Sequence, residues 1–228
     1  MKKVLFLFAI IISSCTVFVS CSSDNDEDAV NLCEDGIQNG SETGIDCGGD
    51  CQSCEDAYLC NATNSELFYP FDIIEKWTMP ATTNLGTGTY TYTYVGTEDI
   101  NSQTYYKMNV NQGLSGWDYF LHYRINSEGE VFRRNSYDDE DYLLVSDIKP
   151  VGYEWFRPLD PTETFKIISK DASLETSLCT YTGLIKIEER HDGELWATYY
   201  YKKGLGLVFE KTYGILSSAR SLQSIDLQ

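Results

Sequence analysis

The run Thr89-Tyr90-Thr91-Tyr92-Thr93-Tyr94-Val95 decides the fold class of this chain. Every position holds an aromatic or β-branched residue, and successive side chains of a strand point to opposite faces of a sheet. The run therefore predicts a strand with tyrosines on one face and threonines on the other. The composition agrees with this prediction, because 17 Tyr, 10 Phe and 4 Trp stand against only 5 Pro, a balance that favours β-structure over disorder.

The same texture continues on both sides of this run, over residues 66–228. Residues 117–125 alternate in the same way, and His191-Asp192-Gly193-Glu194 has the composition of a hairpin turn. No sustained helical period is present, so we expect about ten antiparallel strands in an all-β domain, arranged as a β-sandwich or a barrel-like fold. Besides 89–95 and 117–125, the expected strands are 104–110, 130–133, 142–145, 164–169, 184–190, 195–202, 207–213 and 221–227.

A small cysteine-rich module, residues 33–60, precedes this domain. Its cysteines are Cys33, Cys47, Cys51, Cys54 and Cys60. Because large apolar side chains are scarce there, cross-links rather than hydrophobic burial must hold the module. Disulfides suit a protein outside the reducing cytoplasm, whereas zinc bound by the thiolates is the alternative. If the first four cysteines pair among themselves, Cys60 is left for the distant Cys179, although six cysteines allow fifteen connectivities.

The same module carries oxygen donors separated by glycines. Calcium prefers carboxylate and amide oxygens, and glycines permit the tight turns that a calcium loop needs. Asp and Asn also occupy turns for backbone reasons alone. A calcium site that coexists with the disulfides is therefore one hypothesis, and its ligands would be Asp35, Asn39, Glu42 and Asp46.

The N-terminus reads as a secretion leader followed by a lipid anchor. Residues 1–20 combine two lysines with an apolar run, which predicts a signal peptide. Phe18-Val19-Ser20-Cys21 resembles a lipobox, which implies lipidation of Cys21, and Cys15 is the competing lipidation site. Residues 21–32 would then be the anchor and an acidic tether, which places the domain in the envelope.

Two further resemblances concern the family. The spacing from Cys33 through Asp46-Cys47-Gly48-Gly49 to Cys54 resembles a short cysteine-rich motif of secreted and lipid-anchored bacterial proteins. The tether resembles the serine-plus-acid signal of surface lipoproteins of the Bacteroidota type, and Tyr199 to Val208 resembles the closing hairpin of uncharacterised all-β lipoprotein domains. These likenesses imply an outer-membrane lipoprotein at the cell surface, with a periplasm-facing position as the alternative.

The charge of the chain limits its partners. The formal net charge is −18, and residues 22–58 contain acidic but no basic side chains. Such a field repels nucleic acid and anionic lipid surfaces. The membrane therefore enters as a partner only through the N-terminal lipid, and nucleic acid is excluded as a partner.

Candidate catalytic residues are few. The two histidines are His122, in mid-strand, and His191, in a turn, and both contexts are explained without catalysis. Cys179 acting as a nucleophile with His191 is an alternative to a structural disulfide. The acidic pairs Glu188-Glu189 and Asp138-Asp139 would suit a hydrolase that uses two carboxylates.

Three functions remain open on this sequence. The main expectation is a non-enzymatic binding domain for an extracellular glycan or protein, whose tyrosines and tryptophans either fill the core or form an exposed platform. A glycan-directed hydrolase with paired carboxylates is the second. A lipocalin-like carrier of a small apolar ligand is the third, and a deep cavity would favour it.

Overall fold

The computed structural model describes residues 32–61, 65–113, 115–135, 139–215 and 217–228. The signal peptide, both candidate lipidation cysteines and nearly all of the acidic tether lie outside the described residues. The described part contains a 3-10 helix η1 (Leu32–Glu34), a helix α1 (Cys54–Asn61) and thirteen strands. The strands are β1 (Ile74–Thr83), β2 (Gly86–Ile100), β3 (Gln103–Gln112), β4 (Trp117–Ile125), β5 (Val131–Arg134), β6 (Asp141–Val145), β7 (Glu154–Arg157), β8 (Asp160–Glu175), β9 (Thr180–His191), β10 (Glu194–Lys202), β11 (Gly206–Thr212), β12 (Ser218–Ser221) and β13 (Ser224–Leu227).

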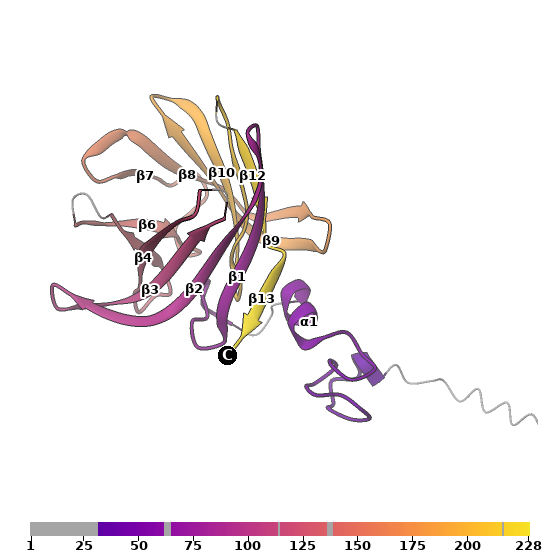
Figure 1. The fold of residues 1–228 in the computed structure, drawn as a ribbon. Helices are drawn as coiled ribbons and strands as arrows, with labels where there is room; N and C mark the ends of the chain where they lie inside the picture. The colour runs from indigo at the N-terminus through magenta and orange to yellow at the C-terminus, as the bar shows by residue number, and fades with distance from the viewer. Residues whose placement is uncertain (1–31, 62–64, 114, 136–138, 216) are drawn as a thin grey trace, which may run out of the picture.

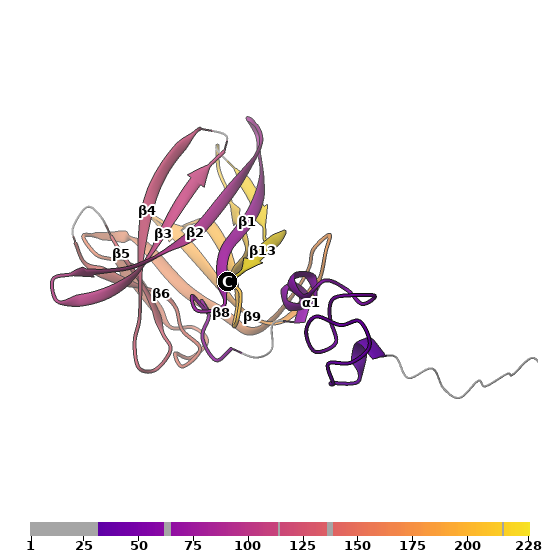
Figure 2. The same ribbon diagram turned by 60° about the horizontal axis from the view of Figure 1, so that its bottom comes forward.

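All strands belong to one antiparallel sheet that curls into a nearly closed barrel (Figure 1, Figure 2). The strand order is β6-β5-β4-β3-β2-β1-β12-β11-β10-β9-β8-β7, and β13 also pairs with β1. The two end strands meet through a side chain, because Trp155 Nε1 on β7 donates a 2.7 Å hydrogen bond to the carbonyl oxygen of Leu143 on β6. The expected all-β, barrel-like class is therefore confirmed.

Three of the strands are not among those expected from the sequence. Two of them, β7 and β12, have only four residues each. The third, β1, contains Pro80, and a proline argues against a central strand because it cannot donate to the ladder. The structure accommodates this proline where β1 changes partner, since residues up to Thr78 pair with β13 and residues from Ala81 pair with β12.

An aromatic segment before β1 fills part of the interior. Tyr69 stacks on Tyr123 of β4 with ring centroids 5.3 Å apart, and Phe71 stacks on Tyr106 of β3 at 4.5 Å. Gly206 lies against the Tyr69 ring with a φ of +77°, and a Cβ there would come within 2.3 Å of the ring. Only glycine fits this position, because both the backbone angle and the space exclude a side chain.

The cysteine module is joined to the sheet covalently. Its disulfides are Cys33–Cys51 and Cys47–Cys54, and Cys60 is bonded to Cys179 between β8 and β9. Helix α1, which the sequence did not predict, lies beside β13 (Figure 1) and buries Leu59 to 2% exposure. Among the helices of the described residues, none has the length and hydropathy of a bilayer-spanning segment.

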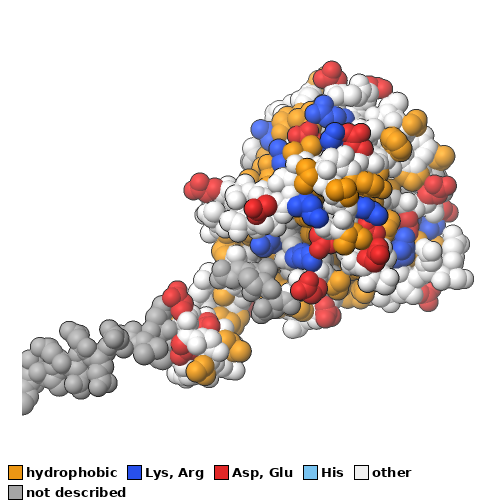
Figure 3. Space-filling model, turned by 180° about the vertical axis from the view of Figure 1, so that it is seen from behind, with side chains coloured by type: hydrophobic (Ala, Val, Ile, Leu, Met, Phe, Trp, Pro, Cys, Tyr) orange, Lys and Arg blue, Asp and Glu red, His pale blue; other side chains and the backbone are white. Residues whose placement is uncertain are grey.

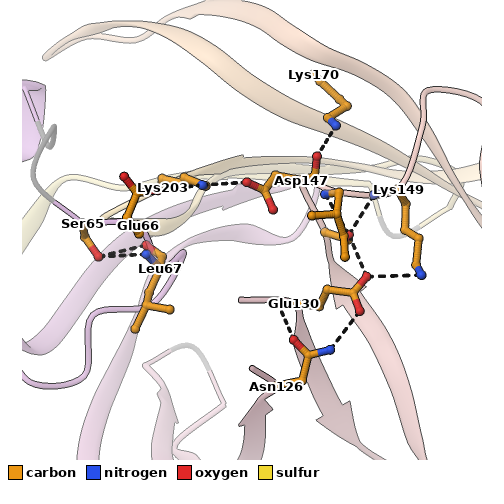
Figure 4. Close-up of polar contacts among 11 residues, drawn as sticks. Ser65, Glu66, Leu67, Asn126, Glu130, Asp147, Lys149, Lys170 and Lys203 are labelled. Atoms are coloured by element: carbon orange, nitrogen blue, oxygen red, sulfur yellow. Dashed lines mark hydrogen bonds and ion pairs between the residues drawn. The ribbon is translucent and has the colours of Figure 1, made fainter. Parts of the chain in front are cut away.

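Polar contacts fix one end of strands β4, β5 and β6 (Figure 4). The buried Glu130 accepts hydrogen bonds from Ser146 Oγ at 2.8 Å and Asn126 Nδ2 at 2.9 Å. Asp147 forms an ion pair with Lys203 at 2.6 Å. Because Asn126 follows β4 and Ser146 follows β6, the other ends of these strands, where β4 and β6 begin, are not held by this network.

The outer surface of the sheet has no single sign of charge in the view of Figure 3, where acidic, basic and apolar side chains alternate. This pattern matches the sequence, in which the acidic excess is concentrated before residue 59. The interior accounts for part of the large tyrosine content, since Tyr92, Tyr123, Tyr142 and Tyr201 are all buried.

Candidate ligand-binding site

The wall of the sheet is incomplete beside the first half of β4. Strand β4 pairs with β5 only over Tyr123–Ile125, whereas its other edge pairs with β3 over Trp117–Tyr123. On the β5 side, residues 117–122 therefore have no strand partner in the described part of the chain. Trp117 and Phe120 are 74% and 52% exposed at this edge. The gap forms an opening into the sheet.

A vestibule of about 690 Å³ occupies this opening. Three arginines line it, Arg133 and Arg134 from β5 and Arg157 from β7. The carboxylates in its lining are Glu98 and Asp139. In a chain with a net charge of −18, this excess of guanidinium groups over carboxylates marks the vestibule as locally basic.

An interior cavity of about 90 Å³ adjoins the vestibule. The residues that line both spaces are Tyr119, Leu121, Arg133, Tyr142 and Arg157. Deeper in, the lining is mixed, with apolar side chains such as Met108 and Ile187 beside tyrosine hydroxyls. A molecule that enters between β4 and β5 would therefore pass the arginines before it reaches the interior.

Arg133 differs from every other arginine of the chain. Among the described residues it forms no ion pair, whereas the other five arginines each contact a carboxylate, namely Arg124, Arg134, Arg157, Arg190 and Arg220. Its guanidinium carbon lies 6.0 Å from the centre of the Tyr142 ring, and Arg157 lies 5.3 Å from the same ring. Tyr142 thus stands near two cations, and only one of them has a carboxylate partner within the described ranges.

The tyrosines around the cavity are hydrogen-bond donors. Burial raises the pKa of Tyr123, Tyr199 and Tyr201 above the ordinary phenol value. All three therefore remain protonated at neutral pH and present hydroxyl groups rather than charges. Further along the lining, Arg220 forms an ion pair with Glu210, so these two charges compensate each other.

A buried acidic cluster adjoins the same interior. Glu163 on β8 and Glu189 on β9 are 4% and 3% exposed. His191 Nε2 lies 2.6 Å from Glu189 Oε1 and 3.9 Å from Glu163 Oε1. Arg157 Nη2 lies 2.5 Å from Glu163 Oε1, an ion pair rather than an aligned hydrogen bond, because that oxygen has no hydrogen-bond donor. The cluster therefore holds Arg157 in the vestibule wall.

The electrostatics of this cluster favour a bound proton. Burial raises the pKa of Glu163 to about 7, Arg157 opposes the rise, and the neighbouring Glu189 adds to it. Glu189 also accepts a hydrogen bond from Tyr199, whose side chain lines the cavity. His191 is covered by Trp196, with ring centroids 4.6 Å apart.

The structure separates the acidic pairs expected from the sequence. Glu188 faces outward and contacts Arg190 at 3.0 Å, whereas Glu189 faces the interior. Asp138 lies outside the described residues, and Asp139 pairs with Arg134. Cys179 is bonded to Cys60 and has no free thiol, so the hypothesis that it acts as a nucleophile is wrong.

The two histidines occupy different surroundings. His122 lies in the vestibule wall, 3.1 Å from Glu98, and His191 belongs to the buried acidic cluster. The disulfides of the module leave none of its thiols free for zinc.

The residues proposed for calcium bind one another and the backbone. Asn39 Nδ2 donates to Asp35 Oδ2 at 2.7 Å, and the backbone N–H of Asn39 donates to the Glu42 carboxylate at 2.9 Å. Asp46 accepts the Gly36 amide through both oxygens, at 2.9 Å and 3.0 Å. Turn formation accounts for these contacts, and the calcium site stays a prediction.

Sequence reasoning did not find Arg133, Arg157 or Glu163. A signal for the first was present in Arg133-Arg134, because two consecutive residues of a strand cannot both face solvent in a closed sheet. In the same way, the pair Glu188-Glu189 indicated that one of its two side chains faces inward. Arg157 and Glu163 had no comparable signal, since their pairing depends on the register of β7 against β8.

No protein-family model matches the chain, and no curated protein matches it. Among solved structures, a Bacteroides fragilis protein described as exported, with a YmcC-like fold, is 12% identical; the match covers 66% of this chain and 94% of the other, with a TM-score of 0.43. A Parabacteroides distasonis protein described as a lipoprotein is 15% identical; that match covers 72% of this chain and all of the other, with a TM-score of 0.46.

Proposed function

We propose that this chain is a lipid-anchored cell-envelope protein whose barrel-like domain binds a small organic molecule inside the sheet and does not transform it. The anchor rests on the leader and on Cys21 in its lipobox-like context. The binding role rests on the vestibule and the interior cavity that adjoins it, which share five lining residues. Concave sites that combine apolar walls with a few polar groups are typical of small-molecule binding.

The distribution of aromatic side chains favours this role over an exposed glycan platform. Five of the seven buried tyrosines line the interior cavity, namely Tyr69, Tyr92, Tyr123, Tyr142 and Tyr201, and the exposed rings of Tyr119 and Phe120 line the vestibule. An opening flanked by aromatic rings suits entry of an organic molecule. Compared with the apolar carrier expected from the sequence, the cavity differs in holding arginine and tyrosine hydroxyls, so its ligand is polar at one end.

The buried carboxylates give the hydrolase alternative little support. Glycosidases place two carboxyl groups roughly 5–10 Å apart across an open cleft. Glu163 and Glu189 instead lie with oxygens of the pair within 4.8 Å of each other, and Arg157, His191 and Tyr199 engage them. Their present contacts suit a structural proton-sharing pair.

Binding is tested with the secreted Cys21→Ser form, which carries the full mature chain without lipid. Calorimetric titration with 2-naphthamide, a neutral two-ring probe, should give saturable binding. Leu121→Phe should weaken it at least about tenfold, because Leu121 lines both spaces and the larger ring fills them. Leu85→Phe is the matched control, since Leu85 is 82% exposed. Equal binding by all three proteins would contradict an interior site.

The anchor is tested separately by membrane fractionation. Cys21→Ala should release the protein from the membrane fraction, and Cys15→Ala should leave it attached. Release by the Cys15 change alone would reassign the lipidated residue.

A further inference from the structure

We propose that the ligand of this site is an organic monoanion, a carboxylate or its chemical equivalent, whose charged group is bound by Arg133. This inference rests on the proposed function and adds to it the chemical class of the ligand and the residue that selects it. It starts from the guanidinium of Arg133, which reaches both the vestibule and the cavity.

An uncompensated guanidinium inside a protein is unfavourable. Removing a charge from water costs free energy unless a counter-charge or several hydrogen bonds replace the water. The chain supplies that counter-charge to all five of its other arginines and not to Arg133 among the described residues. A ligand anion would supply the missing counter-charge of Arg133. The planar guanidinium group can bind a carboxylate through two parallel hydrogen bonds.

The surroundings limit the ligand to a single negative charge. Arg157, the nearest other cation around Tyr142, lies against the Glu163–Glu189 pair, which keeps one negative charge when it holds one proton. Glu210, whose carboxylate is paired with Arg220, lines the same cavity. A phosphate monoester with two charges would face these carboxylates with only one free guanidinium, whereas a carboxylate balances Arg133 one to one.

The remaining lining indicates an organic body behind the charged group. Leu121, Met108 and Ile187 supply apolar contact, and the hydroxyl group of Tyr123 supplies a donor for an oxygen atom of the ligand. Inorganic anions would leave this apolar surface unused. The vestibule arginines would also attract an anion towards the opening against the repulsion of the acidic protein.

The experiment compares probes that differ in charge and share one ring system. The unlipidated full mature chain is titrated with 2-naphthoate, 2-naphthamide and 2-naphthylmethylammonium. The acid should bind at least about tenfold more tightly than the amide, because charge-assisted hydrogen bonds exceed neutral ones by that much or more. The ammonium probe should bind most weakly.

Arg133→Met should abolish the preference for the acid, with the affinity for the acid falling to that for the amide. Arg190→Met is the matched control, since Arg190 is outside the cavity lining and pairs with Glu188, and it should keep the preference. Circular dichroism checks that each variant is folded, and Arg133→Gln gives a second, polar replacement.

The outcomes separate the two proposals. Saturable binding of acid and amide with equal affinity would overturn the monoanion inference and leave the interior site standing. Absence of binding for all three probes would overturn both. A preference for the acid that persists in both Arg133 variants would also overturn the assignment, because another cation would then be the receptor.

Discussion

Trp155 on β7 donates the hydrogen bond that joins it to Leu143 on β6, at 2.7 Å. These residues belong to the two ends of the twelve-strand path, so a side chain rather than a ladder closes the sheet at this point. Trp155 is 7% exposed, and the lost bond would therefore not be replaced by water.

Replacing this indole with a phenyl ring should weaken closure. Trp155→Phe removes the donor and leaves the Leu143 carbonyl oxygen unpaired, which should lower the free energy of unfolding by about 1–3 kcal/mol. Urea titration followed by circular dichroism measures the change. Trp117→Phe is the control, because Trp117 is 74% exposed and its replacement should change stability little. Equal effects of the two substitutions would argue against a role of the Trp155–Leu143 hydrogen bond in closing the sheet.

Substitution of Gly206 should lower stability more than substitution of a glycine that has a similar φ but free space around it. Both Gly206 and Gly193 have positive φ, at +77° and +84°, but only Gly206 would place a Cβ against Tyr69. Gly193→Ala should cost about 1 kcal/mol from backbone strain alone, and Gly206→Ala should cost at least about 2 kcal/mol more because the Tyr69 ring must move. Thermal unfolding compares the two. Similar losses of stability in the two variants would mean that the Tyr69 ring moves aside at little cost in free energy.

The Glu163 carboxyl should make stability fall as pH rises towards neutrality. Its pKa is raised to about 7 in the folded state, above the value near 4.3 of an unperturbed glutamate. Between these values the folded state holds a proton that the unfolded state has lost, so stability decreases from about pH 4.5 to about pH 7 and then levels off. Glu163→Gln mimics the protonated form and should flatten this decrease.

Unfolding curves measured between pH 4 and pH 8 test this expectation. Glu188→Gln is the control, because Glu188 neighbours Glu189 in sequence but faces outward and pairs with Arg190; its pH profile should follow that of the parent protein. A Glu163→Gln profile that still falls over the same range would assign the proton to another group.

Arg133 and Arg220 should respond oppositely to the same substitution. Arg220→Met leaves Glu210, which is 8% exposed, without its ion-pair partner and should lower the free energy of unfolding by about 3 kcal/mol. Arg133→Met removes a charge that pairs with no carboxylate in the part of the chain that the structure describes, and it should leave stability unchanged or raise it. Chemical denaturation in the absence of ligand measures both. A large loss for Arg133→Met would mean that this residue serves the fold rather than a ligand.

The strands were largely predictable from local alternation. The run from Thr89 to Val95 lies within β2, and residues 117–125 form β4. The turn expected at Asp192 and Gly193 is also present in the structure, where both residues adopt positive φ. Local rules suffice for such features, since they depend on neighbours in the sequence.

Closure and the site depend on distant residues and were less predictable. Whether β6 meets β7 is decided by the accumulated curl of twelve paired strands, which no short pattern encodes. Arg133 becomes distinctive only because no carboxylate among the described residues pairs with it, which depends on how the distant strands around the cavity come together. The pattern Arg133-Arg134 showed that one guanidinium must face inward, but not that it would remain unpaired.

The central claim is that Arg133 binds the charged group of a ligand inside the sheet. Nitrogen-15 NMR of the arginine side chains tests it most directly, with the Arg133 Nε–H signal identified by its absence in Arg133→Met. Titration with 2-naphthoate should shift this signal in proportion to saturation, and 2-naphthamide should shift it much less. An Arg133 signal that stays in place while 2-naphthoate saturates the protein would contradict the claim.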